Sequence, residues 1–400
     1  MKREAAMQTA FATPHQHHTA VTGACPLWQG LRTRGVQTVA VMGMSKNTGK
    51  TVCLNHLLQQ AQQDQVAVGL TSIGRDGEER DEVFAIPKPP VHVTPGCLVA
   101  TARDTLVRAK VRTRQIGGTG ILSPMGEILL VKALDAGAME VAGPSRSHDQ
   151  QRVIALLQQC GAELVLLDGA LGRSQHASPA IADGVILATG AALGGGMGDV
   201  LRKTRDRLAI LGIAPAPADM AEQVQATFVQ CGVGVWNRRG QCLFNKPIAS
   251  LNAGSALLAL QAKMEGGAHG KAGPSTDGHA HEGVDRPAWD GPANMAVIAV
   301  SGAVGQMLWR AVLTLLDQYP GLTLVVADGT KLFIDAADVT AFERRGGRLL
   351  AMRDIRLLGV TLNPFSPFGG SFDARAFLHE ARAALYEHIV TDVFLCQEGS

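Results

Sequence analysis

The sequence predicts an α/β fold with a mostly parallel sheet, followed by a smaller C-terminal α/β domain. Short, continuous apolar runs bounded by Gly or Asp alternate with stretches of helical spacing, which is typical of parallel strands buried on both faces. Ala, Gly, Leu and Val dominate and aromatic residues are sparse, as expected where β-branched strands pack against helices. At 400 residues the chain is long enough for two domains.

The first domain is predicted to span residues 36–264, after an N-terminal arm (1–35) that we expect to be flexible. A hairpin with strands at 233–236 and 241–244, followed by a helix at 250–263, is expected to end it. The predicted strands before the hairpin are 39–42, 66–70, 163–167 and 185–188, and the predicted helices are 52–62, 126–136, 147–159 and 198–211.

Residues 265–292 are rich in Gly, His, Pro, Ser and Asp, so a disordered linker is expected there. The C-terminal domain is predicted to span 293–396. Its expected strands are 295–300, 322–326, 348–352 and 357–362, and its expected helices are 305–317, 336–345 and 372–388.

Charge and cysteine usage narrow the class of protein. The net charge is only +2, which argues against a nucleic-acid partner or a polybasic membrane patch. No apolar run is long enough for a membrane span, and the polar residues 1–22 do not have the pattern of a signal peptide. The seven scattered cysteines indicate reduced, mostly buried thiols in a cytoplasmic protein. His15, His17 and His18 are a possible metal cluster, but a flexible tail explains them better.

The most informative stretch is residues 43–51, Gly-Met-Ser-Lys-Asn-Thr-Gly-Lys-Thr, between a predicted strand and a predicted helix. Gly49 lets the backbone approach phosphate oxygens, Lys50 supplies charge to the β and γ phosphates, and Thr51 offers a hydroxyl to magnesium. The pattern is one residue longer than the strict Walker A motif; the alternative is a chance Gly-Lys-Thr in a surface turn. We predict a P-loop NTPase domain that binds ATP with Mg²⁺ and acts as an ATPase. The expected nucleotide contacts are Gly43, Ser45, Lys46, Asn47, Thr48, Gly49, Lys50, Thr51 and Val52.

Carboxylates at strand ends are expected to complete a magnesium-nucleotide site. Asp168 ends the apolar strand at 163–167, and Asp76 follows the strand at 66–70. We predict catalytic roles for Lys50, Asp76 and Asp168, and metal ligation by Thr51, Asp76 and Asp168. Structural roles remain open for both acids, because Asp-Gly is a common turn pair and a strand-end Asp often caps a helix.

Other loops are weaker candidates. Arg173 would contact phosphate or stand in solvent, and Thr189 to Ala191 would line the base pocket or form a plain turn. In the C-terminal domain, Ser301, Asp328 and the loop at 363–370 are expected to meet at one sheet edge. Phe365 and Phe368 of that loop would either contact a protein or pack onto the core.

The spacing of the phosphate loop resembles dethiobiotin synthetase and its relatives in the SIMIBI class, which read G-T-D-x-x-V-G-K-T. Gly43, Gly49, Lys50 and Thr51 match, whereas Met44 and Ser45 replace the Thr-Asp pair. The Lys-Pro substrate motif is also missing, and residues 71–76 read Thr-Ser-Ile-Gly-Arg-Asp instead. The resemblance implies the fold; as an alternative function it implies an ATP-dependent ligase acting on a small carboxylated substrate.

A narrower resemblance is carried by several short phrases, at residues 43–51, 71–78, 99–102, 142–145, 168–171 with 177–180, 188–191, 327–331 and 360–364. Together they resemble the reactivase subunit (KamB) of lysine 5,6-aminomutase. This likeness implies an ATP-binding reactivase or chaperone subunit for an adenosylcobalamin-dependent aminomutase, working with a second ATPase reactivase subunit.

Overall fold

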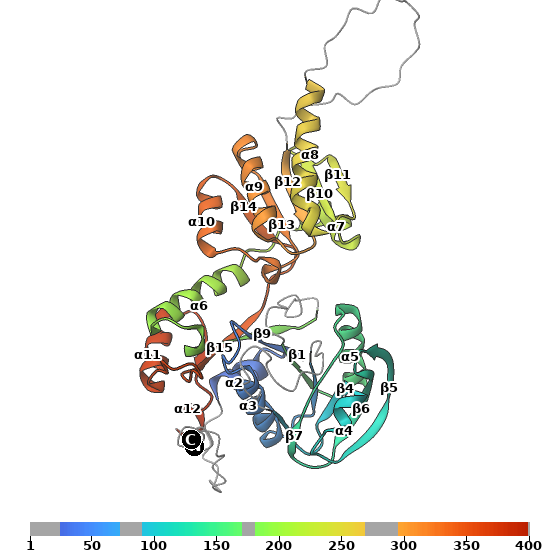
Figure 1. Ribbon diagram of the computed structural model, residues 1–400, viewed down its shortest axis with the longest axis vertical. Coiled ribbons are helices and arrows are strands. Elements are labelled where there is room, and N and C mark those ends of the chain that lie inside the picture. The colour runs from blue at the N-terminus through green and yellow to red at the C-terminus, as the bar shows by residue number, and fades with distance from the viewer. Residues whose placement is uncertain (1–24, 73–89, 170–180, 269–294, 399–400) are drawn as a thin grey trace, which may run out of the picture.

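A computed structural model describes residues 25–72, 90–169, 181–268 and 295–398. Two sheets, each with helices on both faces, form a larger and a smaller body (Figure 1). The predicted α/β class with a mostly parallel sheet is confirmed. No helix in the described ranges is both long and apolar enough to cross a membrane.

The larger body is built on a nine-stranded sheet in the order β16-β15-β9-β1-β8-β2-β4-β6-β5. The seven strands from β16 to β4 are parallel, and β6 and β5 add an antiparallel edge. The strands are β1 (Thr38–Gly43), β2 (Val68–Ser72), β4 (Leu98–Ala102), β5 (Thr113–Ser123), β6 (Gly126–Ala133), β8 (Leu164–Asp168), β9 (Gly184–Gly190), β15 (Leu357–Asn363) and β16 (Val390–Thr391).

Both faces of this sheet are buried, which explains why its strands read as continuous apolar runs. On β1, Ala40 and Met42 join the core under α5, α6 and α11, while Val39 and Val41 join the core under α2 and α3. The helices of this body are α2 (Pro26–Thr33), α3 (Lys50–Gln63), α4 (Arg103–Val107), α5 (Ser147–Gln159), α6 (Met197–Leu211), α11 (Ala374–Ala384) and α12 (Leu395–Glu398). A small pair, β3 (Val91–Val93) with β7 (Gly137–Met139), and a 3₁₀ turn (Ala191–Leu193) complete it.

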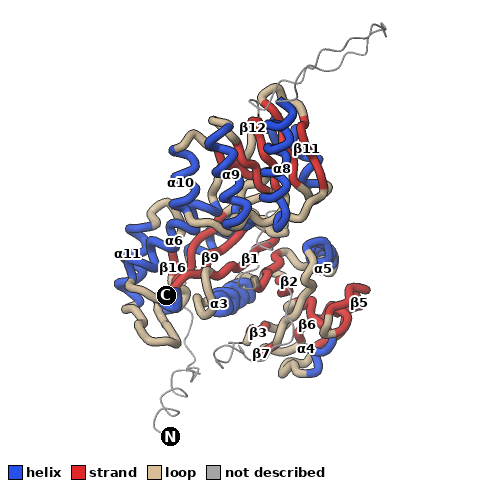
Figure 2. Tube along the Cα trace, turned by 45° about the horizontal axis from the view of Figure 1, so that its top comes forward, coloured by secondary structure: helices blue, strands red, loops and turns tan. Residues whose placement is uncertain are grey.

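The smaller body is a five-stranded sheet in the order β11-β10-β12-β13-β14. Its last three strands are parallel, and the hairpin β10–β11 pairs antiparallel to β12. Helices α8, α9 and α10 cover one face and α7 covers the other. Figure 2 shows the three helices of the first face in a second view. The elements are α7 (Ala218–Val229), β10 (Val233–Asn237), β11 (Cys242–Lys246), α8 (Ser250–Ala268), β12 (Met295–Val300), α9 (Gln306–Gln318), β13 (Thr323–Val326), the 3₁₀ turn η4 (Gly329–Lys331), α10 (Ala336–Arg344) and β14 (Arg348–Ala351).

The two sheets do not correspond to the two predicted domains, 36–264 and 293–396. The hairpin β10–β11 joins β12 in the smaller sheet, while β15 and β16 return to the larger sheet beside β9 (Figure 1). Most of these strands are apolar, and an apolar strand pattern does not reveal which sheet a strand joins. The carboxyl end of β15 lies beside the loop at residues 43–51, where Asn363 contacts Asn47.

Two local predictions are wrong. Residues 126–133 form strand β6, not a helix, because consecutive side chains such as Leu129 and Leu130 are buried on opposite faces of the sheet. Within the expected N-terminal arm, α2 is an ordered helix whose Leu27, Trp28 and Leu31 are buried, and the indole of Trp28 donates to Asp64. Residues 1–24 of the arm, including its three histidines, lie outside the described residues, as do residues 269–292 of the expected linker.

The cysteines differ from the expectation that most are buried. All seven are thiols; Cys25, Cys53 and Cys97 are buried, Cys396 is half-buried and the remaining three are exposed.

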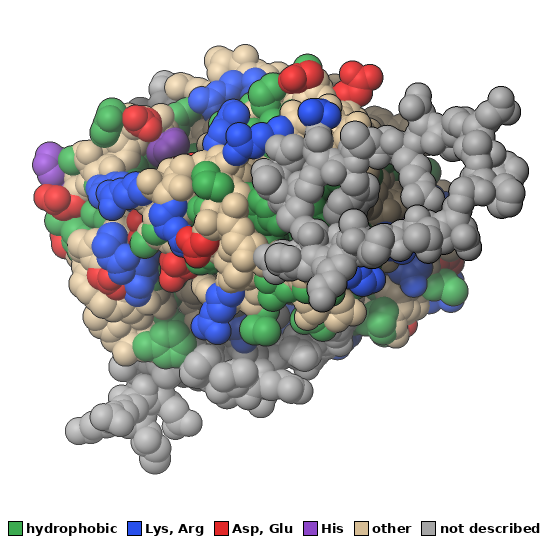
Figure 3. Space-filling model, turned by 90° about the horizontal axis from the view of Figure 1, so that it is seen from above, with side chains coloured by type: hydrophobic (Ala, Val, Ile, Leu, Met, Phe, Trp, Pro, Cys, Tyr) green, Lys and Arg blue, Asp and Glu red, His purple; other side chains and the backbone are tan. Residues whose placement is uncertain are grey.

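The top face of the molecule carries Lys and Arg side chains interspersed with Asp and Glu (Figure 3).

Candidate nucleotide-binding site

The loop at residues 43–51 lies at the carboxyl edge of the larger sheet, between β1 and α3. Its backbone takes two left-handed turns, at Asn47 (φ 62°) and at Gly49 (φ 88°), which caps the start of α3. Left-handed turns of this kind direct backbone N–H groups toward one side, and the first N–H groups of a helix such as α3 have no acceptor within the helix. The loop therefore has the backbone required to hold an anion at the positive end of a helix.

The side chain of Lys50 folds back over this loop. Its Nζ donates to the carbonyl of Ser45 at 3.3 Å, and the buried hydroxyl of Thr48 donates to the same carbonyl at 2.9 Å. A Cβ built at Gly43 would stand 2.6 Å from that Nζ and 2.7 Å from the Thr48 hydroxyl. Glycine at position 43 is thus what lets the Lys50 ammonium lie against the loop.

The other predicted contacts lie where the sequence places them. Ser45 and Lys46 are half-buried in the loop, with the Ser45 hydroxyl donating to the Lys46 carbonyl at 3.0 Å. Thr51 and Val52 begin α3 and are half-buried. The structure thus brings the nine predicted nucleotide contacts together around one turn and one helix start.

Asp168 ends β8, the strand beside β1, in register with Val41. Its residue is 7% exposed, so burial and the parallel pairing fix it at the carboxyl edge. Gly169 continues this contact: its N–H donates to the Val41 carbonyl at 3.2 Å, and a Cβ there would stand 2.5 Å from that oxygen. Asp168 therefore lies on the strand adjacent to the phosphate loop, at the same sheet edge, as a magnesium carboxylate should.

Asp76 and Arg173 lie outside the described residues. Within the described ranges, no group of three or more His, Cys, Asp or Glu is arranged to hold a metal ion. Magnesium bound with a nucleotide needs no such cage, because it usually keeps waters and uses one or two protein oxygens plus phosphates. Thr51 and Asp168 are the described residues that fit that limited role.

Asn363 was predicted as part of a different sheet edge, and this prediction is wrong. Its Nδ2 donates to the carbonyl of Asn47 at 2.7 Å, and its Cβ lies 3.0 Å from where a Cβ of Gly49 would stand. Ser301 and Asp328, its expected neighbours, follow β12 and β13 of the smaller sheet. Each is engaged there: the Ser301 hydroxyl donates to the Gly232 carbonyl at 3.0 Å, and Asp328 accepts from the Thr330 N–H at 2.9 Å.

The neighbouring strand β9 supplies backbone rather than side chains. Gly190 pairs with Asn363, and a Cβ there would stand 2.1 Å from the Asn363 carbonyl oxygen. Thr189 is fully buried and shares a 2.7 Å hydrogen bond with Thr204 of α6. Its side chain is therefore committed to the core, which argues against the predicted role in lining a base pocket.

The loop after Asn363 carries two exposed aromatic side chains. Phe365 is 49% exposed and Phe368 is 55% exposed, whereas Phe372 packs edge-on against Phe377 of α11 at 5.1 Å between ring centroids. The Phe372 N–H donates to the Pro364 carbonyl at 2.9 Å, which closes the loop at its base. Phe372 is therefore the aromatic residue of this loop that packs onto the core. Phe365 and Phe368 are about half exposed.

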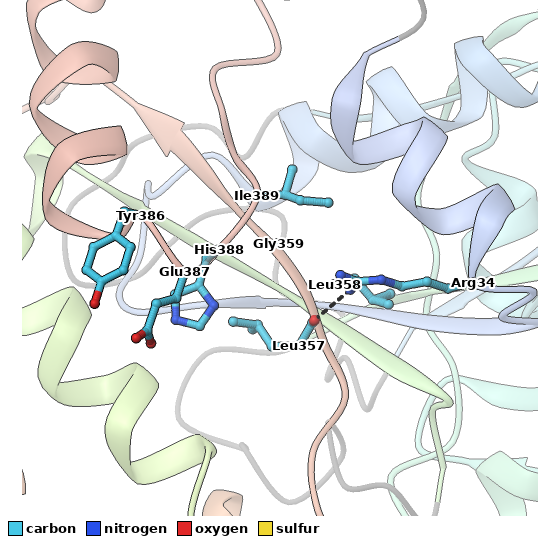
Figure 4. A pocket seen from close by; sticks show the side chains of 8 residues that line it. All are labelled: Arg34, Leu357, Leu358, Gly359, Tyr386, Glu387, His388 and Ile389. Carbon is cyan, nitrogen blue, oxygen red and sulfur yellow. Dashed lines mark hydrogen bonds between the residues drawn. The ribbon is translucent and has the colours of Figure 1, made fainter.

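A pocket of about 290 Å³ lies at the opposite end of β15 (Figure 4). Leu357, the first residue of β15, and the turn from Tyr386 to Ile389 line it, with Arg34. The Arg34 guanidinium donates to the Leu357 carbonyl at 3.0 Å. Because this is the amino end of the parallel strands, the pocket is separate from the phosphate loop.

No family model, curated protein or solved structure matches this chain.

Proposed function

We propose that residues 43–51 bind Mg-ATP and that the protein is an ATP-dependent reactivase subunit for an adenosylcobalamin-dependent aminomutase. The observation that carries the proposal is the hydrogen bond from Asn363 to the Asn47 carbonyl. It ties the phosphate loop to a second loop that presents two exposed aromatic side chains, Phe365 and Phe368. Nucleotide binding and partner binding would then be coupled through one residue.

The phosphate loop supplies the groups that a polyphosphate needs. In this proposal the Lys50 ammonium, which donates to the Ser45 carbonyl, would turn toward the β and γ phosphates. The hydroxyl of Thr51 would hold magnesium, and Asp168 would hold it through a water or orient the attacking water; the ion would neutralise charge on the phosphates. The N–H groups at the start of α3 face the negative charge.

A reactivase must bind its mutase with different affinity in the ATP and ADP states, since otherwise hydrolysis shifts nothing. Loss of the γ phosphate frees Lys50 and changes the turn at Asn47, whose carbonyl holds Asn363. The backbone from Asn363 leads directly into the aromatic loop. Aromatic side chains are the residues that most often anchor protein interfaces. The mutase, and a second ATPase reactivase subunit, are the partners that the resemblance implies.

The proposal is tested with purified protein and an adenosylcobalamin-dependent lysine aminomutase loaded with a damaged cobalamin. Binding of ATP and GTP is measured by calorimetry, and mutase binding and recovery of its activity are measured with ATP, with ADP and without nucleotide. We expect Lys50→Ala to abolish ATP binding and mutase rescue. Lys263→Ala, an exposed lysine on α8, is the matched control and should behave as wild type.

Three outcomes would each overturn part of the proposal. Rescue that persists in Lys50→Ala removes the role of the nucleotide. ATP turnover that rises with small amino or dicarboxylic acids, without any protein partner, favours the ligase of the dethiobiotin synthetase type instead. Absence of calorimetric heat with both triphosphates contradicts nucleotide binding itself.

A further inference from the structure

Two cysteines that are 371 residues apart in the sequence meet on the face of the larger sheet that carries α2 and α3. Cys25 caps the start of α2, and Cys396 lies in α12. The thiol of Cys396 donates to the sulfur of Cys25 at 3.3 Å between the two Sγ atoms. Thr391 of β16 lies against both sulfurs, 2.9 Å from Cys396 and 3.7 Å from Cys25.

The surroundings favour a thiolate at Cys25. Its hydrogen bond with Cys396, and further hydrogen bonds from His56 and the Leu27 backbone, lower the pKa of the Cys25 thiol well below its ordinary value, against an opposing effect of burial. The N-terminus of α2 acts in the same direction. By contrast, burial raises the pKa of Cys53 and of Cys97 to about 12, so these two thiols are unreactive.

We propose that Cys25 and Cys396 are an oxidisable dithiol pair that forms a reversible disulfide when the protein meets hydrogen peroxide. The two sulfurs are already in contact, and only a small side-chain movement separates 3.3 Å from a covalent bond of about 2.05 Å. Cys396 is half-buried, which gives a small oxidant access to a pair whose other member is 2% exposed.

The chemistry balances in two steps. The Cys25 thiolate attacks one peroxide oxygen, the O–O bond breaks, and the departing hydroxide takes a proton to become water, which leaves a sulfenic acid on Cys25. Cys396 then loses its proton and attacks the Cys25 sulfur; the S–O bond breaks and the hydroxyl leaves as a second water. The two sulfurs together lose two electrons, and peroxide is reduced to two molecules of water. A thiol reductant reverses the result by exchange.

The bond would join α2 to α12 across β16, the outermost strand of the nine-stranded sheet. His56 and Cys53 of α3 adjoin this cluster, and α3 begins with Lys50 of the phosphate loop. A cross-link that closes so long a loop restricts the unfolded chain, so the oxidised protein should unfold at a higher temperature than the reduced protein.

The test uses the full chain with its three exposed cysteines replaced, C160S/C231S/C242S, so that Cys25, Cys53, Cys97 and Cys396 remain. After treatment with hydrogen peroxide, peptides are mapped without reduction. We expect one linked pair, Cys25 with Cys396, which disappears on adding dithiothreitol, and a rise in the unfolding temperature that disappears with it. Cys53 and Cys97 should stay reduced, which makes them internal controls.

Cys396→Ser provides a second test, which measures the sulfenic acid on Cys25 and does not depend on the disulfide. Because position 396 is half-buried, this variant should fold, and Cys25 should then accumulate as a sulfenic acid that dimedone traps. Complete loss of the linked peptide is expected in this variant. The proposal is overturned if the folded parent gives no linked peptide, if the link forms only in urea, or if dimedone labels Cys25 no faster than Cys53.

Discussion

Asn363 donates its Nδ2 to the carbonyl of Asn47 at 2.7 Å, joining the end of β15 to the middle of the phosphate loop. The two residues are far apart in the sequence, and the sequence pattern predicts that they belong to different domains. Asn47 holds a left-handed backbone conformation (φ 62°), which costs energy for a residue with a Cβ. The hydrogen bond offsets part of that cost and holds the loop in the shape that faces an anion.

Asn363→Ala should weaken Mg-ATP binding about fivefold, because a single such hydrogen bond contributes roughly 1 kcal/mol. The loss should appear in calorimetric affinity, with the unfolding temperature changing little. Asn252→Ala, an exposed asparagine on α8, is the matched control. An unchanged affinity in Asn363→Ala would show that the phosphate loop does not need the link to β15.

Much of this site could be predicted from sequence because its chemistry is local. Gly43, Gly49, Lys50 and Thr51 lie within nine consecutive residues, and the strand and helix that hold them follow from their own apolar spacing. The placement of Asp168 follows from one further rule, that parallel strands share a carboxyl edge.

Asn363 could not be placed in the same way, since its position depends on which sheet β15 joins. Nothing in an apolar seven-residue strand encodes that choice; the pairing with β9 is decided by packing between distant segments. The same limit applies to β6, where Leu129 and Leu130 are both buried and periodicity alone does not separate strand from helix. The dithiol of Cys25 and Cys396 likewise arises from contacts across the whole chain.

Asp168→Asn should leave ATP binding nearly intact and slow any ATP hydrolysis by the protein, alone or with its partner, by about a hundredfold. The change removes a charge at almost constant shape, and losing one polar group at a reacting centre costs roughly that much. Steady-state phosphate release at saturating Mg-ATP measures it. Asp206→Asn, at a partly exposed position on α6 where the carboxylate pairs with Arg202, controls for the loss of one negative charge. Equal turnover in both variants would assign Asp168 a purely structural role.

Alkaline pH should destabilise the fold through the two inert thiols. Burial raises the pKa of Cys53 and Cys97 to about 12 in the folded protein, above the ordinary value of 9.0 for the unfolded chain. A pKa raised by folding means that the stabilising effect is complete below pH 9 and is lost as pH rises toward 12. At pH 10 each thiol should lower the free energy of unfolding by roughly 1 kcal/mol. Urea midpoints at pH 7 to 10 measure this decline.

A Cys53→Ala/Cys97→Ala variant isolates the two thiols. Its stability at neutral pH should fall because buried atoms are removed, but its decline between pH 9 and 10 should be shallower than that of the parent. A decline as steep as the parent's would assign the alkaline effect to other groups.

Phe365→Ser/Phe368→Ser should reduce binding to the mutase at least tenfold while leaving Mg-ATP affinity unchanged. Both side chains are about half exposed, so their removal costs little folding stability, whereas aromatic anchors at an interface commonly contribute 2 kcal/mol or more, on the order of a thirtyfold change in affinity. Phe333→Ser, similarly exposed on the smaller body, is the matched control. The decisive comparison is binding with ATP against binding with ADP. If the double variant keeps the nucleotide-dependent difference, the aromatic loop is not the surface through which the phosphate loop acts on a partner.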